Sequence, residues 1–212
     1  MKRRQALKNL GLSLGTITIT PSILGLLQSC QNNLDWNPVF FEKKHINLIS
    51  ELSDLIIPSD DEVPGSKELN LIKFIDLYVF NVNSESDKIL LANSTNLFVK
   101  DCLKKSNKDD VANINQNDLK ASLEYFFENK KMQKKWSSDF TKFKNGSRDL
   151  INDEVIEASS HNFLTTIRQL TITAFKGNEL IGEKVLAYSP IPGQQKGCVD
   201  LQSTTGGKAW SL

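Results

Sequence analysis

Residues 42–82, EKKHINLISELSDLIIPSDDEVPGSKELNLIKFIDLYVFNV, decide the fold class of this chain. Apolar residues recur every three or four positions on both sides of an acidic turn, which is the spacing of an amphipathic helix. We therefore expect a helix over residues 42–57 that Pro58 ends, a loop over 59–68 and a second helix over 69–82. The second segment also fits a strand, but its length and its sparse turn residues favour a helix.

Similar patterns continue towards the C-terminus. Ser84 or Ser86 is expected to cap a third helix that reaches about residue 104, and Asn117 or Asp118 to cap a fourth after a polar loop. Residues 153–175 predict a long helix, although the β-branched run TTIRQLTIT, residues 165–173, favours a strand in part. A short helix over 179–187 precedes the tail. The sequence thus predicts a mainly α protein: a single helical domain of about five to six helices with an irregular, Pro/Gly-containing C-terminal extension.

A basic segment, residues 130–144, carries three aromatic residues between its lysines, namely Trp136, Phe140 and Phe143. Such a run can contact acidic lipid headgroups. It is more often a solvated helix face whose aromatic side chains turn inward, and we favour that interpretation.

The first thirty residues, MKRRQALKNLGLSLGTITITPSILGLLQSC, contain four bases and no acid before a mildly apolar run. This is the layout of an export signal, and the pair Arg3–Arg4 resembles the twin-arginine class. An ordinary signal or an uncleaved membrane anchor is the alternative. The twin-arginine route carries folded proteins, usually because a cofactor is inserted before export into the protein or its partner.

The end of this segment, Leu27-Gln28-Ser29-Cys30, resembles a bacterial lipoprotein signal. A lipid on Cys30 would hold the protein at the periplasmic side of a membrane without a spanning helix. Cleavage nearby without a lipid is the alternative. We expect three parts: the signal over residues 1–30, a tether over 31–41 that docks Trp36, Phe40 and Phe41 on the body, and a helical domain over 42–212.

Charge and length narrow the class of protein. Removal of residues 1–30 takes four bases away and changes the formal net charge from +1 to −3. A nucleic-acid-binding protein would need a clearly basic face, so this class is not indicated. The remaining length suits one domain with a core.

Chemical motifs are scarce. His45 and His161 lie far apart, and neither has a second His or Cys at ligand spacing, so both are expected to be surface or helix-face residues and not zinc ligands. The chain has no Cys-x-x-Cys-His, no Gly-x-Gly-x-x-Gly after a strand and no Gly-x-Ser-x-Gly. The acidic group Asp60, Asp61 and Glu62 could bind calcium or act as an acid/base pair, but a solvated loop is the better interpretation. The sequence therefore predicts a non-catalytic chain.

The C-terminal tail has a more distinctive sequence than the rest of the chain. Residues 182–201 read GEKVLAYSPIPGQQKGCVDL, where the prolines favour an extended path and the glycines permit turns. This composition suits a docking strip for a partner protein; a tail that wraps its own helices is the alternative. The strip comprises Tyr188, Pro190, Pro192, Gly193, Gly197 and Cys198. In an oxidising compartment Cys102 and Cys198 could pair, or one of them could bond a partner.

Three places in the chain resemble the small subunit of membrane-bound gluconate 2-dehydrogenase complexes, the subunit 3 family. They are LIIPSDDEVPGS (55–66) followed by LIKFIDLYV (71–79), NELIGEKVLAYSPIPG (178–193), and KGC (196–198). The resemblance implies a large flavoprotein partner that holds FAD and oxidises a sugar or sugar acid, and a cytochrome subunit with haem c as a further partner. It implies that the small subunit carries the twin-arginine signal, binds no cofactor itself and helps to export or mature the flavoprotein.

Three functions follow in order of preference. The first is a non-catalytic accessory subunit of an exported, membrane-associated flavin-dependent dehydrogenase complex. The second is a stand-alone cell-envelope lipoprotein that binds a ligand or partner. The third is a small enzyme that uses the loop from Asp60 to Glu62.

Overall fold

The computed structural model describes residues 36–146, 152–191, 193–194 and 197–211. The chain divides into two units, Met1–Asn37 and Pro38–Leu212. Only Trp36 and Asn37 of the first unit are described, and all helices named below belong to the second unit. The assigned division into a signal, a tether and a helical domain stays a prediction.

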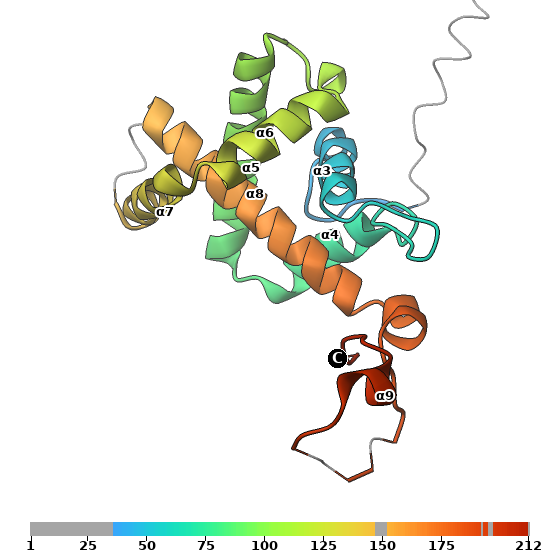
Figure 1. Ribbon diagram of the computed structural model, residues 1–212. Coiled ribbons are helices and arrows are strands. Elements are labelled where there is room, and N and C mark those ends of the chain that lie inside the picture. Colours follow the sequence, from blue (N-terminus) through green and yellow to red (C-terminus); the bar gives the residue numbers. More distant parts are fainter. Residues whose placement is uncertain (1–35, 147–151, 192, 195–196, 212) are drawn as a thin grey trace, which may run out of the picture. The chain divides into compact units, whose positions relative to one another are not determined.

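The second unit is built mainly of helices (Figure 1). In chain order they are α3 (Lys43–Ile56), α4 (Leu71–Val82), α5 (Glu85–Ser106), the 3-10 helix η1 (Val111–Asn113), α6 (Gln116–Glu128), α7 (Lys130–Asn145), α8 (Asp153–Lys176), the π-helix η2 (Ile181–Val185) and α9 (Leu201–Thr205). The described residues form no β-strand, and an isolated parallel bridge joins Ala187 to Trp210. The expected mainly α fold is confirmed.

Helix α8 is the central element of the second unit. It contacts α3, α4, α5 and α7, and Figure 1 shows it in orange as it crosses α5. Within the β-branched run 165–173 the buried residues are Ile167 and Thr171, four positions apart on one helix face, and the packing of this face outweighs a modest strand preference. Thr171 fits because its hydroxyl donates to the carbonyl of Ile167 at 2.8 Å. The buried apolar positions of α8 are Ile156, Ala158, Phe163, Leu164, Ile167 and Ala174.

Two aromatic clusters join the helices around α8. Phe98 of α5 stacks on Phe163 of α8 with ring centroids 4.8 Å apart. Phe126 of α6 meets Trp136 of α7 edge-on at 4.9 Å. All four side chains are fully or almost fully buried. Burying a side chain of this size stabilises the fold by about 1.5–3 kcal/mol, so these clusters are major contributors.

Polar caps set the helix boundaries. Ser84 begins α5, and its side chain accepts the N–H of Asp87 at 3.2 Å. Helix α6 begins after Asn115, which forms a capping box with Asp118. The expected cap at Asn117 or Asp118 is therefore wrong by two or three residues, because Asp118 acts as the partner in the box and not as the cap.

A tight turn connects α3 to α4. The carboxylate of Asp60 accepts the N–H groups of Glu62 at 2.9 Å and Val63 at 2.8 Å. At Gly65 the chain returns so closely that a Cβ there would lie 2.3 Å from the backbone nitrogen of Ser59. Only glycine fits such an approach. The quoted motif PSDDEVPGS thus has a structural explanation.

A buried carboxylate on α4 holds the segment that leads into α3. Asp76, which is fully buried, accepts the N–H groups of Val39 at 2.7 Å, Phe40 at 3.1 Å and Phe41 at 2.8 Å. The ring of Phe41 is itself buried. Three backbone donors are thereby satisfied by one side chain, which fixes the start of the helical unit on α4.

The C-terminal region is more ordered than expected. The predicted short helix over 179–187 is present mainly as the π-helix η2. Beyond it, α9 was not predicted; Asp200 caps this helix through the N–H of Ser203 at 2.8 Å, and Gly206 ends it with φ +63°. No helix in the described part of the chain is both long and apolar enough to cross a bilayer.

Candidate functional site

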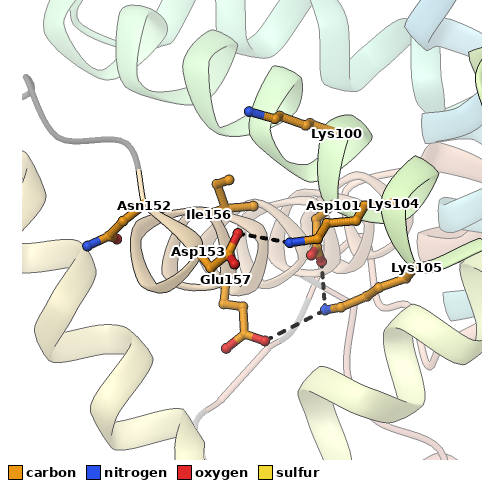
Figure 2. Close-up of a pocket in the computed structure, with 8 residues that line it drawn as sticks. All are labelled: Lys100, Asp101, Lys104, Lys105, Asn152, Asp153, Ile156 and Glu157. Atoms are coloured by element: carbon orange, nitrogen blue, oxygen red, sulfur yellow. Dashed lines mark hydrogen bonds and ion pairs between the residues drawn. The ribbon is translucent and has the colours of Figure 1, made fainter.

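A charged groove of about 690 Å³ lies between α5 and the first turns of α8 (Figure 2). Asn152 caps α8 by accepting the N–H of Val155 at 2.9 Å, and it lies at the edge of the groove. The lining residues are Lys100, Asp101, Lys104, Lys105, Asn152, Asp153, Ile156 and Glu157.

Lys105 is the centre of the charge network in this groove. Its Nζ lies 2.8 Å from Asp101 Oδ2 and 4.0 Å from Glu157 Oε1, as the dashed lines of Figure 2 show. The same ammonium group lies over the rings of Tyr125 and Phe126, at 4.1 and 4.6 Å from their centroids. Such a cation is stabilised by both the acids and the aromatic faces.

Glu157 connects this network to two more helices. It accepts the hydroxyl of Tyr125 at 2.9 Å and the indole N–H of Trp136 at 3.2 Å. The network therefore joins α5, α6, α7 and α8 through one carboxylate. Lys104 makes a second and more exposed pair with Asp153 at 3.0 Å.

Burial raises the pKa of two groups in this network. It raises the pKa of Asp101 above the ordinary value, although the hydrogen bond from Lys105 opposes this. Burial, with help from the hydrogen bond to Glu157, raises the pKa of Tyr125 to about 12. Tyr125 is therefore a protonated donor at any physiological pH.

The paired charges of the groove hold helices together. Its described lining offers no hydroxyl, thiol or imidazole that a base could activate. Asp101, Asp153 and Glu157 are each paired to a lysine. The sequence analysis missed this network; the i, i+4 spacing of Asp101 and Lys105 on one helix was the available signal.

The tail forms a closed loop. Ala187 donates its N–H to the carbonyl of Ala209 at 2.9 Å, and Ser211 donates to the carbonyl of Ala187 at 2.9 Å. The chain therefore returns to its starting point after α9. Between residues 188 and 210, no described residue is buried, so the tail does not wrap the helices. Its exposed large apolar residues are Tyr188, Ile191, Val199, Leu201 and Trp210.

The residues assigned to the docking strip lie on this loop. Tyr188 is 51% exposed, and Pro190, Gly193, Gly197 and Cys198 are exposed too. Gly193 has φ +66°, a backbone conformation that favours glycine. Pro192 lies outside the described residues. The docking role of the strip stays a prediction.

Both remaining cysteines are free thiols in the structure. Cys102 is buried on α5, and burial raises the pKa of its thiol. Cys198 is exposed on the tail loop. A Cys102–Cys198 disulfide is therefore not formed here, and the exposed Cys198 is the more accessible of the two for a bond to a partner.

The other candidate residues take structural positions. Asp60 organises its turn, and backbone N–H donors lower the pKa of its carboxyl. Within the described residues no group of His, Cys, Asp and Glu could hold a metal ion. His45 and His161 lie on the inward faces of α3 and α8 and are buried, so of the two expected positions the helix face is confirmed and the surface is wrong. Burial lowers the pKa of each imidazole.

The basic segment 130–144 is helix α7. Trp136 and Phe143 are buried and Phe140 is half-buried, which agrees with the expectation that the aromatic residues turn inward. The export and lipidation residues Arg3, Arg4 and Cys30 lie outside the described residues.

Comparison with known proteins identifies the class. A model of the family described as gluconate 2-dehydrogenase subunit 3 matches residues 43–193, from the first residue of α3 into the tail loop. No curated protein and no solved structure matches the chain. The chain belongs to the gluconate 2-dehydrogenase subunit 3 family, and the family name describes one subunit of a dehydrogenase complex.

Proposed function

We propose that this chain is the non-catalytic accessory subunit of an exported, membrane-associated, flavin-dependent sugar or sugar-acid dehydrogenase complex. The match of residues 43–193 to the subunit 3 family carries this proposal. In this role the chain supplies an export signal and a docking surface. FAD belongs to the partner flavoprotein, and haem c to a possible cytochrome subunit.

The tail loop is the proposed docking surface. Its exposed apolar residues contribute little to the stability of the free chain, since they remain in water. Large exposed apolar groups on a monomer are typical of protein–protein contacts. The loop is closed by the bridge between Ala187 and Trp210, so less conformational entropy is lost when a partner binds.

The export role rests on the sequence. Arg3 and Arg4 resemble a twin-arginine signal, which exports folded proteins, and a flavoprotein must fold around its cofactor first. A lipid on Cys30 would keep the complex at the periplasmic face of a bacterial membrane.

Affinity capture from native membranes tests the accessory role. The full-length chain should retain a yellow partner under gentle extraction, read as flavin absorbance in the eluate. Tyr188→Ala should release most of that flavin, whereas Ile89→Ala, a change at a similarly exposed residue on α5, should retain it. A stable, colourless monomer in native extracts would favour the stand-alone lipoprotein instead.

Non-reducing electrophoresis of the same complex tests the cysteine. A band that contains both chains and disappears in Cys198→Ser would establish a bond to the partner. A free Cys198 thiol in the complex would exclude both this bond and the pair with Cys102.

A further inference from the structure

Helix α4 exposes an apolar face that the rest of the described chain leaves uncovered. Phe74, Leu77 and Phe80 are 43%, 40% and 46% exposed, although the opposite side of α4 packs against α3 and α8. Phe74 also stacks on Tyr78 with centroids 5.7 Å apart. Large apolar side chains grouped on one helix face indicate a contact surface.

The charges near this face lie on α4 and on the start of α5. The sequence of α4, LIKFIDLYVFNV, has two charged residues: Lys73 is exposed and Asp76 is fully buried. A further cation, Lys88, lies over the ring of Phe80 at 5.0 Å from its centroid and is paired with the exposed Glu85 at 2.8 Å. The exposed surface of α4 therefore combines aromatic and aliphatic groups with the cation Lys73 and presents no carboxylate of its own helix.

Residues 39–41, at the start of the second unit, are held by this same helix. Asp76 binds the N–H groups of residues 39–41, and the side chain of Val39 is 48% exposed beside them. The numbering places Cys30 eight residues before Pro38, a span of at most about 28 Å. Whatever holds Cys30 therefore stays close to α4.

We infer that the exposed face of α4 lies against the phospholipid headgroups of the membrane; this inference rests on the acylation of Cys30 in the proposed function. Aromatic side chains with flanking lysines favour the interface between headgroups and acyl chains. The lipid tether raises the local concentration of the bilayer at α4, so a weak contact suffices to orient the protein. A bilayer contact accounts for the exposed apolar side chains of α4, for the exposed Lys73 and for the short stretch of chain between Cys30 and residues 39–41.

A fluorescent label at residue 77 tests this contact. Leu77→Cys is made in the full-length Cys198→Ser chain, where Cys102 is buried and protected from the label. The labelled lipoprotein is placed in vesicles of phosphatidylethanolamine and phosphatidylglycerol with nitroxide-bearing lipids. Lys120→Cys, an exposed position on α6, is the matched control.

The inference expects quenching and a blue shift of the label at residue 77, with neither at residue 120. A label at residue 77 that stays unquenched overturns it. If that label shifts only when the flavoprotein is present, the face belongs to the protein partner. The mass of the N-terminal peptide reports acylation separately: unmodified Cys30 overturns the proposed anchor and with it this inference, whereas acylated Cys30 with an unquenched label at residue 77 overturns the α4 contact alone.

Discussion

Replacing Asp76 should destabilise the protein more than replacing any exposed carboxylate. The side chain is fully buried and is the acceptor for three backbone N–H groups, those of Val39, Phe40 and Phe41. Asp76→Ala removes all three bonds and leaves the donor of Phe41 buried. Asp76→Asn keeps one oxygen, which can still serve Phe40 and Phe41, but it turns an amide N–H₂ towards the N–H of Val39.

The magnitude follows from the hydrogen bonds. A bond to a charged group contributes about 1.5–3 kcal/mol, and an unsatisfied buried donor costs about 1–3 kcal/mol. Three bonds to one side chain are not additive, and residues 39 and 40 can reach water once released. We therefore expect Asp76→Ala to lower the free energy of unfolding by about 3–5 kcal/mol, and Asp76→Asn by about 2 kcal/mol.

Urea denaturation followed by far-UV circular dichroism measures both values, because the fold is mainly helical. Asp61→Ala, a change in the exposed turn, is the control and should stay within about 0.5 kcal/mol of the parent chain. Amide hydrogen exchange at residues 39–41 should accelerate in both Asp76 variants. Equal stabilities for Asp76→Ala and the parent would refute the reasoning, as would unchanged exchange at these three amides.

Three further predictions concern other parts of the fold. Gly65→Ala should lower the free energy of unfolding by about 2 kcal/mol or more, since the added Cβ meets the backbone of Ser59, and denaturant titration measures this. Burial lowers the pKa of His161, so the unfolded chain binds a proton at this residue more readily than the folded chain does. The free energy of unfolding should therefore fall as the pH drops below the ordinary pKa of 6.5. In melts at several pH values, His161→Asn should reduce this dependence of stability on pH. A double-mutant cycle should give Lys105 and Asp101 a coupling of about 1–2 kcal/mol.

Controls come from the same chain. Gly197 has open space around it, so Gly197→Ala should be close to neutral. The exposed pair of Lys104 and Asp153 should show a weaker coupling than the pair centred on Lys105. A coupling at Lys104 equal to that at Lys105 would mean that burial and the aromatic rings add nothing.

Much of the fold could be predicted because apolar spacing is a strong signal. Residues 42–82 were expected as two helices around a turn, and the structure has α3 and α4 on either side of that turn. The run TTIRQLTIT was ambiguous because strand preference is local, whereas the neighbours that make it helical come from four other helices.

The sites were harder to predict because they depend on contacts distant in sequence. Asp76 falls within an apolar stripe, where a lone acid is unexpected, yet its partners lie 35 to 37 residues earlier. The sequence pattern assigns no role to Glu157, since its partners Tyr125 and Trp136 lie on other helices. The tail was predicted as irregular, and the bridge between residues 187 and 210 has no local sequence signal.

The bridge between Ala187 and Trp210 makes the tail a loop whose two ends lie together. Since the loop begins and ends at one point on the chain, its sequence can diverge without any new adjustment of the helical unit. With the docking role proposed above, a change confined to this short segment would alter the choice of partner while the helical unit stays the same.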